Sequence, residues 1–133
     1  MWAEYKEGLN IEWPFSFSRK EMLTFAKLSG DYNPIHSNDK FAKSKGFQSS
    51  LVYGLLLSSQ FSRLIGEELP DNNSILTEIQ INFLLPSFPG DNLIFKAILS
   101  NKSESTYSLE FKCTISKDNK IMCRGTANAV WRI

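Results

Sequence analysis

Apolar and polar residues alternate regularly in the last part of the chain, which is the pattern of a β-strand with one covered face. The first alternating run has its apolar positions at Tyr107, Leu109, Phe111, Cys113 and Ile115. The second has them at Ile121, Cys123, Gly125, Ala127, Ala129 and Trp131. The intervening string Lys117-Asp118-Asn119 predicts a hairpin turn. We therefore expect two adjacent antiparallel strands with their apolar faces on the same side of a sheet.

The preceding segment predicts two further strands separated by a turn. Ile75, Ile79, Ile81 and Phe83 share one parity. The string PSFPGD, residues 86–91, is dense in turn formers, so one strand should end before it and another begin after it. Residues 93–99 alternate poorly, which predicts a strand buried on both faces. Consecutive strands with short connections favour an antiparallel meander.

The first half of the chain has a helical pattern instead. Ser18 followed by Glu21 predicts a capping box at a helix start, and Gly30 suits the left-handed residue after the helix end. The apolar face of this helix would comprise Met22, Leu23, Phe25, Ala26 and Leu28. Residues 51–69 are apolar nearly all round until a charged end, which is typical of a helix enclosed by other structure. The pattern predicts a single α+β domain, residues 1–133, with an antiparallel sheet covered by one central helix.

Composition and charge narrow the classes of function. The chain has 42% hydrophobic and 22% charged residues, as ordinary globular proteins do. Its formal net charge of +1 gives no general attraction to nucleic acid or to an anionic membrane, so neither is expected as a partner. The sequence has no run of about 18 apolar residues and no secretory leader pattern, so we expect a cytoplasmic protein. Cys113 and Cys123 lack metal-site spacing and are expected to be reduced thiols.

Candidate chemistry gathers in the string GDYNPIH, from Gly30 to His36. His36 is the only histidine, so proton transfer by an imidazole near neutral pH must use it. Gly30 and Asn33-Pro34 are turn formers on either side of Asp31, and a bent loop can bring a carboxylate and an imidazole toward one water molecule. Two other interpretations stay open, because Asp31 can be a turn residue that accepts backbone hydrogen bonds and His36 can be structural.

The segment FAKLSGDYNPIHSNDKFA, residues 25–42, resembles the signature of the MaoC-like hydratases, which include (R)-specific enoyl-CoA hydratases. The resemblance continues through GFQSSLVYGLLLSSQFSRLIGEELP, residues 46–70, and FLLPSFPGD, residues 83–91, and so covers most of the chain. It implies a hot-dog fold, in which an antiparallel sheet wraps around a long central helix. It also implies reversible addition of water to a trans-2-enoyl thioester to give an (R)-3-hydroxyacyl product, with Asp31 and His36 as the acid-base pair.

The same resemblance suggests residues that would bind the substrate. The backbone N–H of Gly54 would stabilise negative charge on the thioester oxygen, at a helix start where the dipole is favourable. The alternative is a glycine needed only for close packing. Ser62 matches a family serine near the active site, although it could instead bond to its own helix backbone. Asn33 and Tyr53 are the other candidates for substrate binding.

Two positions depart from the family pattern. Many members have a proline and a histidine where this chain has Ser50 and Tyr53. Tyr53 can form hydrogen bonds, but it does not titrate as a histidine does. Substrate range or rate could therefore differ from the usual hydratase, while Asp31 and His36 are unaffected.

The expected substrate is an acyl-CoA or an acyl-carrier-protein thioester, and the expected assembly is a homodimer or a higher homo-oligomer. An exposed sheet edge favours such self-association. Lys40, Lys43 and Lys45 could contact the phosphates of coenzyme A or phosphopantetheine, or they could form a solvated helix face. The chain has no P-loop, dinucleotide-binding fingerprint or paired Cys/His ligand set, so no cofactor or metal is expected.

Two other functions are compatible with the same fold. A hot-dog thioesterase would hydrolyse the thioester with a carboxylate, but it does not need the GDYNPIH arrangement. A non-catalytic module would bind an acyl thioester and keep the loop as scaffold, but such a module needs no acid-base pair. The hot-dog dehydratases of fatty-acid synthesis have an H-x-x-x-G setting, whereas His36 is followed by SNDK. The hydratase interpretation is therefore preferred.

Overall fold

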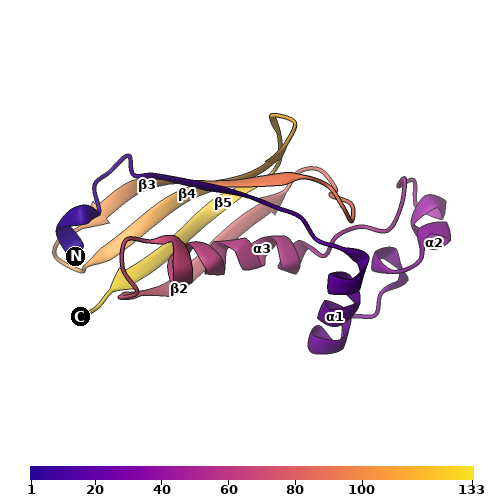
Figure 1. Cartoon of the computed structure of the whole chain (residues 1–133), viewed down its shortest axis with the longest axis horizontal. Coiled ribbons are helices and arrows are strands. Elements are labelled where there is room, and N and C mark those ends of the chain that lie inside the picture. The colour runs from indigo at the N-terminus through magenta and orange to yellow at the C-terminus, as the bar shows by residue number, and fades with distance from the viewer.

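Five antiparallel strands form one sheet in the order β1-β3-β4-β5-β2 in the computed structural model, which describes residues 1–133. The strands are β1 (Asn10–Phe15), β2 (Ser74–Phe83), β3 (Leu93–Ser103), β4 (Ser108–Lys117) and β5 (Lys120–Trp131). Figure 1 shows helix α3 (Gly54–Arg63) lying along the sheet, whereas α1 (Arg19–Ser29) and α2 (Asp39–Ser44) lie beyond one end of it. Short helical turns cover Trp2–Glu4, Pro34–His36 and Leu64–Glu68. The predicted α+β class is confirmed.

The β4–β5 hairpin follows the alternation in the sequence. Asp118 and Asn119 have φ angles of 50° and 63°, which suit a tight two-residue turn and which these residue types tolerate. The predicted apolar positions that are buried in the two strands are Leu109, Phe111, Cys113, Ile115, Cys123, Ala127, Ala129 and Trp131. Both cysteines are free thiols, and burial raises the pKa of each to about 12. Neither thiol therefore ionises near neutral pH.

The order of the strands differs from the predicted meander. Only β3, β4 and β5 form one, while β2 lies beyond β5 at one edge of the sheet and pairs Ile79 with Ala127. The opposite edge is β1, which the sequence pattern did not predict and which pairs Trp13 with Phe95. Pro14 is tolerated in β1 because an edge strand has one side without a hydrogen-bond ladder. Both edge pairings join segments that are far apart in the sequence, so local sequence patterns cannot predict them.

The predicted apolar face of β2 is wrong at Ile75, because the strand contains a bulge. The register shifts between Leu76 and Glu78, and Leu76 rather than Ile75 packs against the core. Ile75 is 55% exposed and does not share the face of Ile79 and Ile81. The reason is that an inserted residue reverses the parity of every position beyond it.

Strand β3 is covered on one face, not on two as predicted. Its buried positions alternate and are Leu93, Phe95, Ala97 and Leu99. Ile94 and Ile98 lie between them, with 47% and 40% of their surface exposed. These two isoleucines weaken the alternation in the sequence although they lie on the open face of the sheet.

Helix α3 covers the sheet but is shorter than the predicted helix over residues 51–69. It begins at Gly54, and beyond Arg63 the chain continues as the π-helical turn Leu64–Glu68. The buried apolar side chains of these two segments are Leu57, Phe61, Leu64 and Ile65. None of the helices combines the length and the apolar character that a lipid bilayer would require of a spanning segment.

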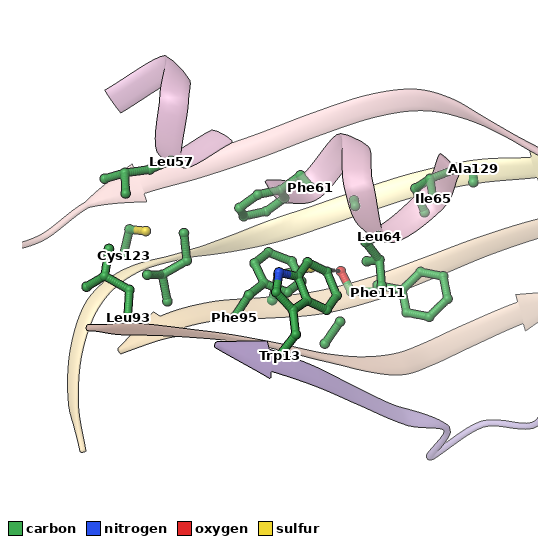
Figure 2. Packing of buried hydrophobic residues seen from close by; sticks show 14 of the residues in the cluster. Trp13, Leu57, Phe61, Leu64, Ile65, Leu93, Phe95, Phe111, Cys123 and Ala129 are labelled. Carbon is green, nitrogen blue, oxygen red and sulfur yellow. Dashed lines mark hydrogen bonds between the residues drawn. The ribbon is translucent and has the colours of Figure 1, made fainter. Parts of the chain in front are cut away.

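Aromatic packing fixes α3 against the sheet. The rings of Phe61 and Phe95 meet edge to face at 5.3 Å between centroids, and Trp13 stacks on Phe95 at 4.5 Å (Figure 2). Such pairs contribute beyond the area that they bury. The buried Gln60 of α3 accepts a 2.8 Å hydrogen bond from the Trp13 indole N–H, so the helix and β1 are joined by a satisfied polar contact as well.

Candidate active site

The loop that carries the predicted pair begins where α1 ends. Ser18 Oγ accepts a hydrogen bond from the Glu21 N–H, and the Glu21 carboxylate accepts one from the Ser18 N–H, so the predicted capping box is confirmed. Gly30 follows the helix with a φ of 78°, a left-handed conformation that glycine adopts without strain. Both ends of α1 are thus set by local chemistry, and the chain leaves the helix at a defined point.

Two side-chain turns then bend the loop. Asp31 Oδ1 accepts a hydrogen bond from the Asn33 N–H at 3.1 Å, and Asn33 Oδ1 accepts one from the Ile35 N–H at 2.9 Å. Asp and Asn favour such turns because their short side chains reach the backbone two positions ahead. Asp31 and Asn33 are both exposed. The turn interpretation of Asp31 is correct, and it leaves the second carboxylate oxygen, Oδ2, without a protein partner.

Two contacts hold the His36 imidazole. Its Nδ1 lies 2.8 Å from the carbonyl oxygen of Leu51, which can only accept a hydrogen bond. Nδ1 must therefore carry a proton, and in the neutral ring Nε2 is the unprotonated nitrogen. The ring also stacks on that of Tyr53, with 3.9 Å between centroids and 23° between planes. Because Nε2 has no protein partner, it is available to a water molecule or a substrate.

Tyr53 contacts both members of the predicted pair. Its hydroxyl donates a 2.7 Å hydrogen bond to the backbone carbonyl of Asp31, while its ring supports His36. The residue is only 3% exposed. Burial and the nearby negative charge of Asp31 raise the pKa of the phenol, so it remains a neutral donor at physiological pH. The proton of the Tyr53 hydroxyl is thus already used in a hydrogen bond to the Asp31 carbonyl.

Two cavities meet at His36. The first, the α1 cavity, has a volume of about 320 Å³ and is lined by Arg19, Met22, Leu23, Ala26, Tyr32, His36, Ser37 and Tyr53. The second, the α3 cavity, has a volume of about 350 Å³ and is lined by His36, Phe47, Leu51, Val52, Gly54, Leu57, Phe83, Leu84, Leu85, Pro86 and Ser87. Both are mainly apolar with a few polar groups, which is typical of sites for small organic ligands. Asp31 lines neither wall.

Gly54 brings a free backbone donor into the α3 cavity. It is the first residue of α3, and its N–H has no hydrogen-bond acceptor within the chain. A helix start leaves such N–H groups unpaired and carries partial positive charge. A Cβ at this position would lie 2.9 Å from the tip of the Phe83 ring, so a larger residue would force the ring or the helix start to shift. The packing interpretation and the donor interpretation are therefore both compatible with the geometry.

Ser87 is a polar residue of the α3 cavity that the sequence analysis did not identify. It is 2% exposed, and its hydroxyl has no hydrogen-bond partner. Its backbone carbonyl accepts a 2.8 Å hydrogen bond from the Val52 N–H, which holds the segment after β2 against the residues just before α3. This contact joins distant parts of the chain, so no local motif marks Ser87 as a neighbour of Gly54.

The other predicted substrate-binding residues lie differently. Asn33 is exposed, and its side chain is used in the turn to Ile35. Ser62 is exposed on α3 and lines neither cavity of the single chain, although Gly54 and Ser62 belong to the same helix. The structure therefore brings His36, Tyr53 and Gly54 together and leaves Ser62 apart. The three lysines of the predicted basic cluster, on and beside α2, are exposed and line neither cavity: Lys40, Lys43 and Lys45.

Ser50, one of the two departures from the family pattern, has a defined structural role. Its N–H and its hydroxyl donate to Asp39 Oδ1 at 3.0 and 2.7 Å, and Arg19 forms a bidentate pair with the same carboxylate at 3.1 Å for each bond. The Ser50 N–H and hydroxyl, together with the guanidinium, hold the pKa of Asp39 well below its usual range. A proline could supply neither donor. The network ties α1 and α2 to the segment that contacts His36.

The chain is similar to known proteins over most of its length. A family model described as "MaoC like domain" matches residues 3–120. An (R)-specific enoyl-CoA hydratase of Aeromonas caviae is 36% identical over 114 residues, which cover 86% of this chain and 81% of that protein. A mitochondrial 3-hydroxyacyl-[acyl-carrier-protein] dehydratase of Arabidopsis thaliana is 29% identical over 118 residues, which cover 86% of this chain and 70% of that protein.

The solved structures lead to the same family. The (R)-hydratase of Aeromonas caviae superposes with a TM-score of 0.90 at 29% sequence identity, covering 96% of this chain and 98% of the other. The predicted hot-dog fold is therefore confirmed. Because the family model and the structural match each span most of the chain, this chain belongs to the MaoC-like family and is an enzyme of the hydratase and dehydratase class.

Proposed function

We propose that this chain adds water to the double bond of a trans-2-enoyl thioester, or removes it in the reverse direction, with Asp31 and His36 as its acid-base pair. Hydration would give an (R)-3-hydroxyacyl thioester. The observation that carries the proposal is the His36 ring, which has a fixed tautomer, a free Nε2 and a place in the walls of both cavities. The similarity to an (R)-specific hydratase supports the stereochemistry.

The reaction requires one proton to be removed and one to be delivered. As the water oxygen bonds to C3, one of the two groups takes a proton from the water, and the proton gained in this way is then delivered to C2, so the overall proton count is unchanged. In the loop, Nε2 of His36 and Oδ2 of Asp31 are free of protein partners. Both groups act on one water molecule in this proposal.

Gly54 would stabilise the charge that this addition creates. Negative charge moves onto the thioester oxygen as the C3–O bond forms, and an oriented N–H donor lowers the energy of that state. The Gly54 N–H is unpaired, lies at the positive end of α3 and borders the same cavity as His36. The thioester head would therefore occupy the α3 cavity, with its carbonyl toward the start of α3.

The proposed substrate class is an acyl-CoA or an acyl-carrier-protein thioester. One relative is named for coenzyme A and another for the carrier protein, so similarity supports both carriers. Arg19, in the α1 cavity, is the one Arg, Lys, Asp or Glu residue that lines either cavity. The thioester head and the acyl chain would therefore be held mainly by apolar contact.

Self-association is part of the proposal. Strand β2 lies at the edge of the sheet, and its outer side has no strand partner. Apolar side chains on and just after β2 are exposed in the single chain: Ile75 (55%), Ile79 (36%), Phe83 (50%), Leu84 (48%) and Leu85 (36%). An apolar sheet edge of this kind favours pairing with a second copy. Light scattering on the purified chain would test for the homodimer or higher homo-oligomer, and a monomer would contradict it.

The activity itself is tested with crotonyl-CoA. The proposal predicts loss of the conjugated enoyl absorbance, and a product that an (R)-specific but not an (S)-specific 3-hydroxyacyl-CoA dehydrogenase oxidises. Asp31→Asn and His36→Ala should each lower turnover by about a hundred- to ten-thousandfold. Asp118→Asn, in the β4–β5 hairpin, is the matched control, and it should leave turnover unchanged because it lies in a solvent-exposed turn.

The same assay separates the two other functions. Release of free thiol without 3-hydroxyacyl product would indicate a thioesterase. Binding of the thioester without turnover at any acyl-chain length, unaffected by His36→Ala, would indicate a binding module. Either result would overturn the hydratase proposal.

A further inference from the structure

We propose that Tyr53 is a positioning residue that holds Asp31 and His36 in their working arrangement, and that its hydroxyl does not bind the substrate. The inference rests on the proposed function, because it concerns the geometry of the proposed acid-base pair. It changes the role that the sequence suggested for Tyr53, which was direct substrate contact.

The hydrogen bonds of Asp31 show why it needs an external support. Its N–H donates to Ser29 Oγ, and its Oδ1 accepts from the Asn33 N–H, so both of these partners lie two positions away. The remaining bond is the one from the Tyr53 hydroxyl to its carbonyl oxygen, which joins residues 22 positions apart. Without the phenol, hydrogen bonds would hold Asp31 only to its immediate neighbours, in an exposed loop.

Tyr53 is well placed to supply this support because its own position is fixed. Its carbonyl accepts hydrogen bonds from Leu56 and Leu57 at 3.1 and 3.2 Å, which makes it the cap of α3. Its ring lies 4.8 Å from that of Phe25 in α1 and 3.9 Å from that of His36. The tyrosine therefore connects the helix that covers the sheet to α1 and to both members of the pair.

The two contacts of Tyr53 can be separated by substitution. Tyr53→Phe removes the hydroxyl but keeps a ring on which His36 can stack. Tyr53→Leu removes both. Proton transfer depends on the placement of the two groups to within a fraction of an ångström. Losing the tether should therefore reduce kcat, whereas losing a substrate contact would raise KM instead.

The experiment measures kcat and KM for crotonyl-CoA in wild type, Tyr53→Phe and Tyr53→Leu. Loss of one neutral hydrogen bond is expected to lower kcat about three- to tenfold with KM within about twofold. Loss of both contacts is expected to lower kcat about a hundredfold. The matched control is Tyr107→Phe, which removes a phenol from a ring packed against Trp131 on the sheet and should leave both constants unchanged. Thermal unfolding of each variant verifies that it is folded.

The single histidine gives a second readout that does not require activity. The ring current of Tyr53 should shift the NMR signals of the stacked His36 ring protons upfield. Tyr53→Phe should keep most of this shift, and Tyr53→Leu should remove it. Unchanged His36 signals in Tyr53→Leu would overturn the inference even if the wild type proved inactive, an outcome that would by itself defeat only the proposed function.

The kinetic arm has equally definite outcomes. A Tyr53→Phe enzyme with wild-type kcat would show that the hydroxyl has no positioning role. A raised KM at unchanged kcat would make the phenol a substrate ligand. Either result would overturn the inference, whereas a fall in kcat that Tyr107→Phe does not share supports it.

Discussion

The carboxylates of Asp71 and Asp31 differ in their hydrogen-bond partners. Asp71, which precedes β2, accepts hydrogen bonds from the Tyr5 hydroxyl and the Trp131 indole, 66 and 60 positions away. Asp31 accepts its side-chain hydrogen bond from Asn33, two positions away. Asp71 also accepts a local hydrogen bond from the Asn73 N–H, but its distant partners engage both of its oxygens and join the N-terminal turn to the end of β5. The local turn at Asp31 leaves one oxygen free for chemistry.

The same difference separates the two regions to which these residues belong. The sheet and α3 form a core in which side chains from distant segments bury one another, as Trp13, Phe61 and Phe95 do. The loop before α2 is shaped by turns and is attached to the rest of the chain at a few points, among them Leu51 and Tyr53. Substitutions in the core should therefore reduce stability, and substitutions around the loop should reduce turnover.

The largest loss of stability is expected in the core. Leu64, at the end of α3, is 0% exposed, and Leu64→Ala should lower the free energy of unfolding by about 2–5 kcal/mol because it leaves a cavity. Leu28→Ala is the matched control, since Leu28 is 81% exposed on α1, and it should change the free energy by less than about 0.5 kcal/mol. Urea unfolding measures both. Equal effects would contradict the dependence of stability on the buried core.

A smaller effect, on activity rather than stability, is expected at the start of α3. Gly54→Ala places a methyl group against the Phe83 ring, so either the ring or the helix start must shift, and both border the α3 cavity next to the free N–H. We expect kcat/KM to fall about tenfold. Gly66→Ala is the control, because a Cβ there meets nothing within 4 Å. Equal activity of the two variants would contradict the role of the Gly54 N–H.

The two regions also differ in what the sequence could predict. The β4–β5 hairpin was predictable because alternation and a two-residue turn are both local signals. The position of β2 was not, because the pairing of Ile79 with Ala127 depends on which distant edge is free. The bulge at Leu76 was missed for a related reason, since no local residue type announces it.

At the candidate site, the sequence could suggest single residues but not the contacts between residues that are far apart in the chain. Asp31 and His36 were predicted as a pair because they belong to one short string. The contact of Tyr53 with Asp31 joins positions 22 apart, and the pairing of Ser87 with Val52 is also long-range, so neither could be inferred from spacing. Ser62 lines neither cavity of the single chain, because a matching position in a helix does not determine which cavity its side chain lines, and its role in substrate binding stays a prediction.

Protonation of Asp71 should lower the stability of the protein at acid pH. Burial alone would raise the pKa of this carboxyl, but hydrogen bonds from Trp131, from the Asn73 N–H and from Tyr5 outweigh it and lower the pKa to about 2. A depressed folded-state pKa contributes stability above the unfolded value of 3.8, and this contribution is lost as the pH falls through about 2. Asp71→Asn should make the decline between about pH 4 and pH 2 shallower in urea unfolding. An unchanged decline would contradict this role.

The smallest expected effect is a gain in stability at the wall of the α3 cavity. The Ser87 hydroxyl is buried without a partner, so Ser87→Ala should raise the free energy of unfolding by up to about 1 kcal/mol. Ser50→Ala is the contrasting control, because that hydroxyl is bonded to Asp39 and its loss should lower stability. Chemical unfolding of the ligand-free protein measures both. A destabilised Ser87→Ala would show that the hydroxyl has a partner after all.

The measurement that tests the central claim most directly is a double-mutant cycle on Asp31 and His36. The kcat/KM for crotonyl-CoA would be compared in Asp31→Asn, His36→Ala and the double variant. If both groups act on one water molecule, each single substitution should reduce kcat/KM by about a hundred- to ten-thousandfold. The kcat/KM of the double variant should then be close to that of the less active single variant. Losses that multiply independently would contradict the account.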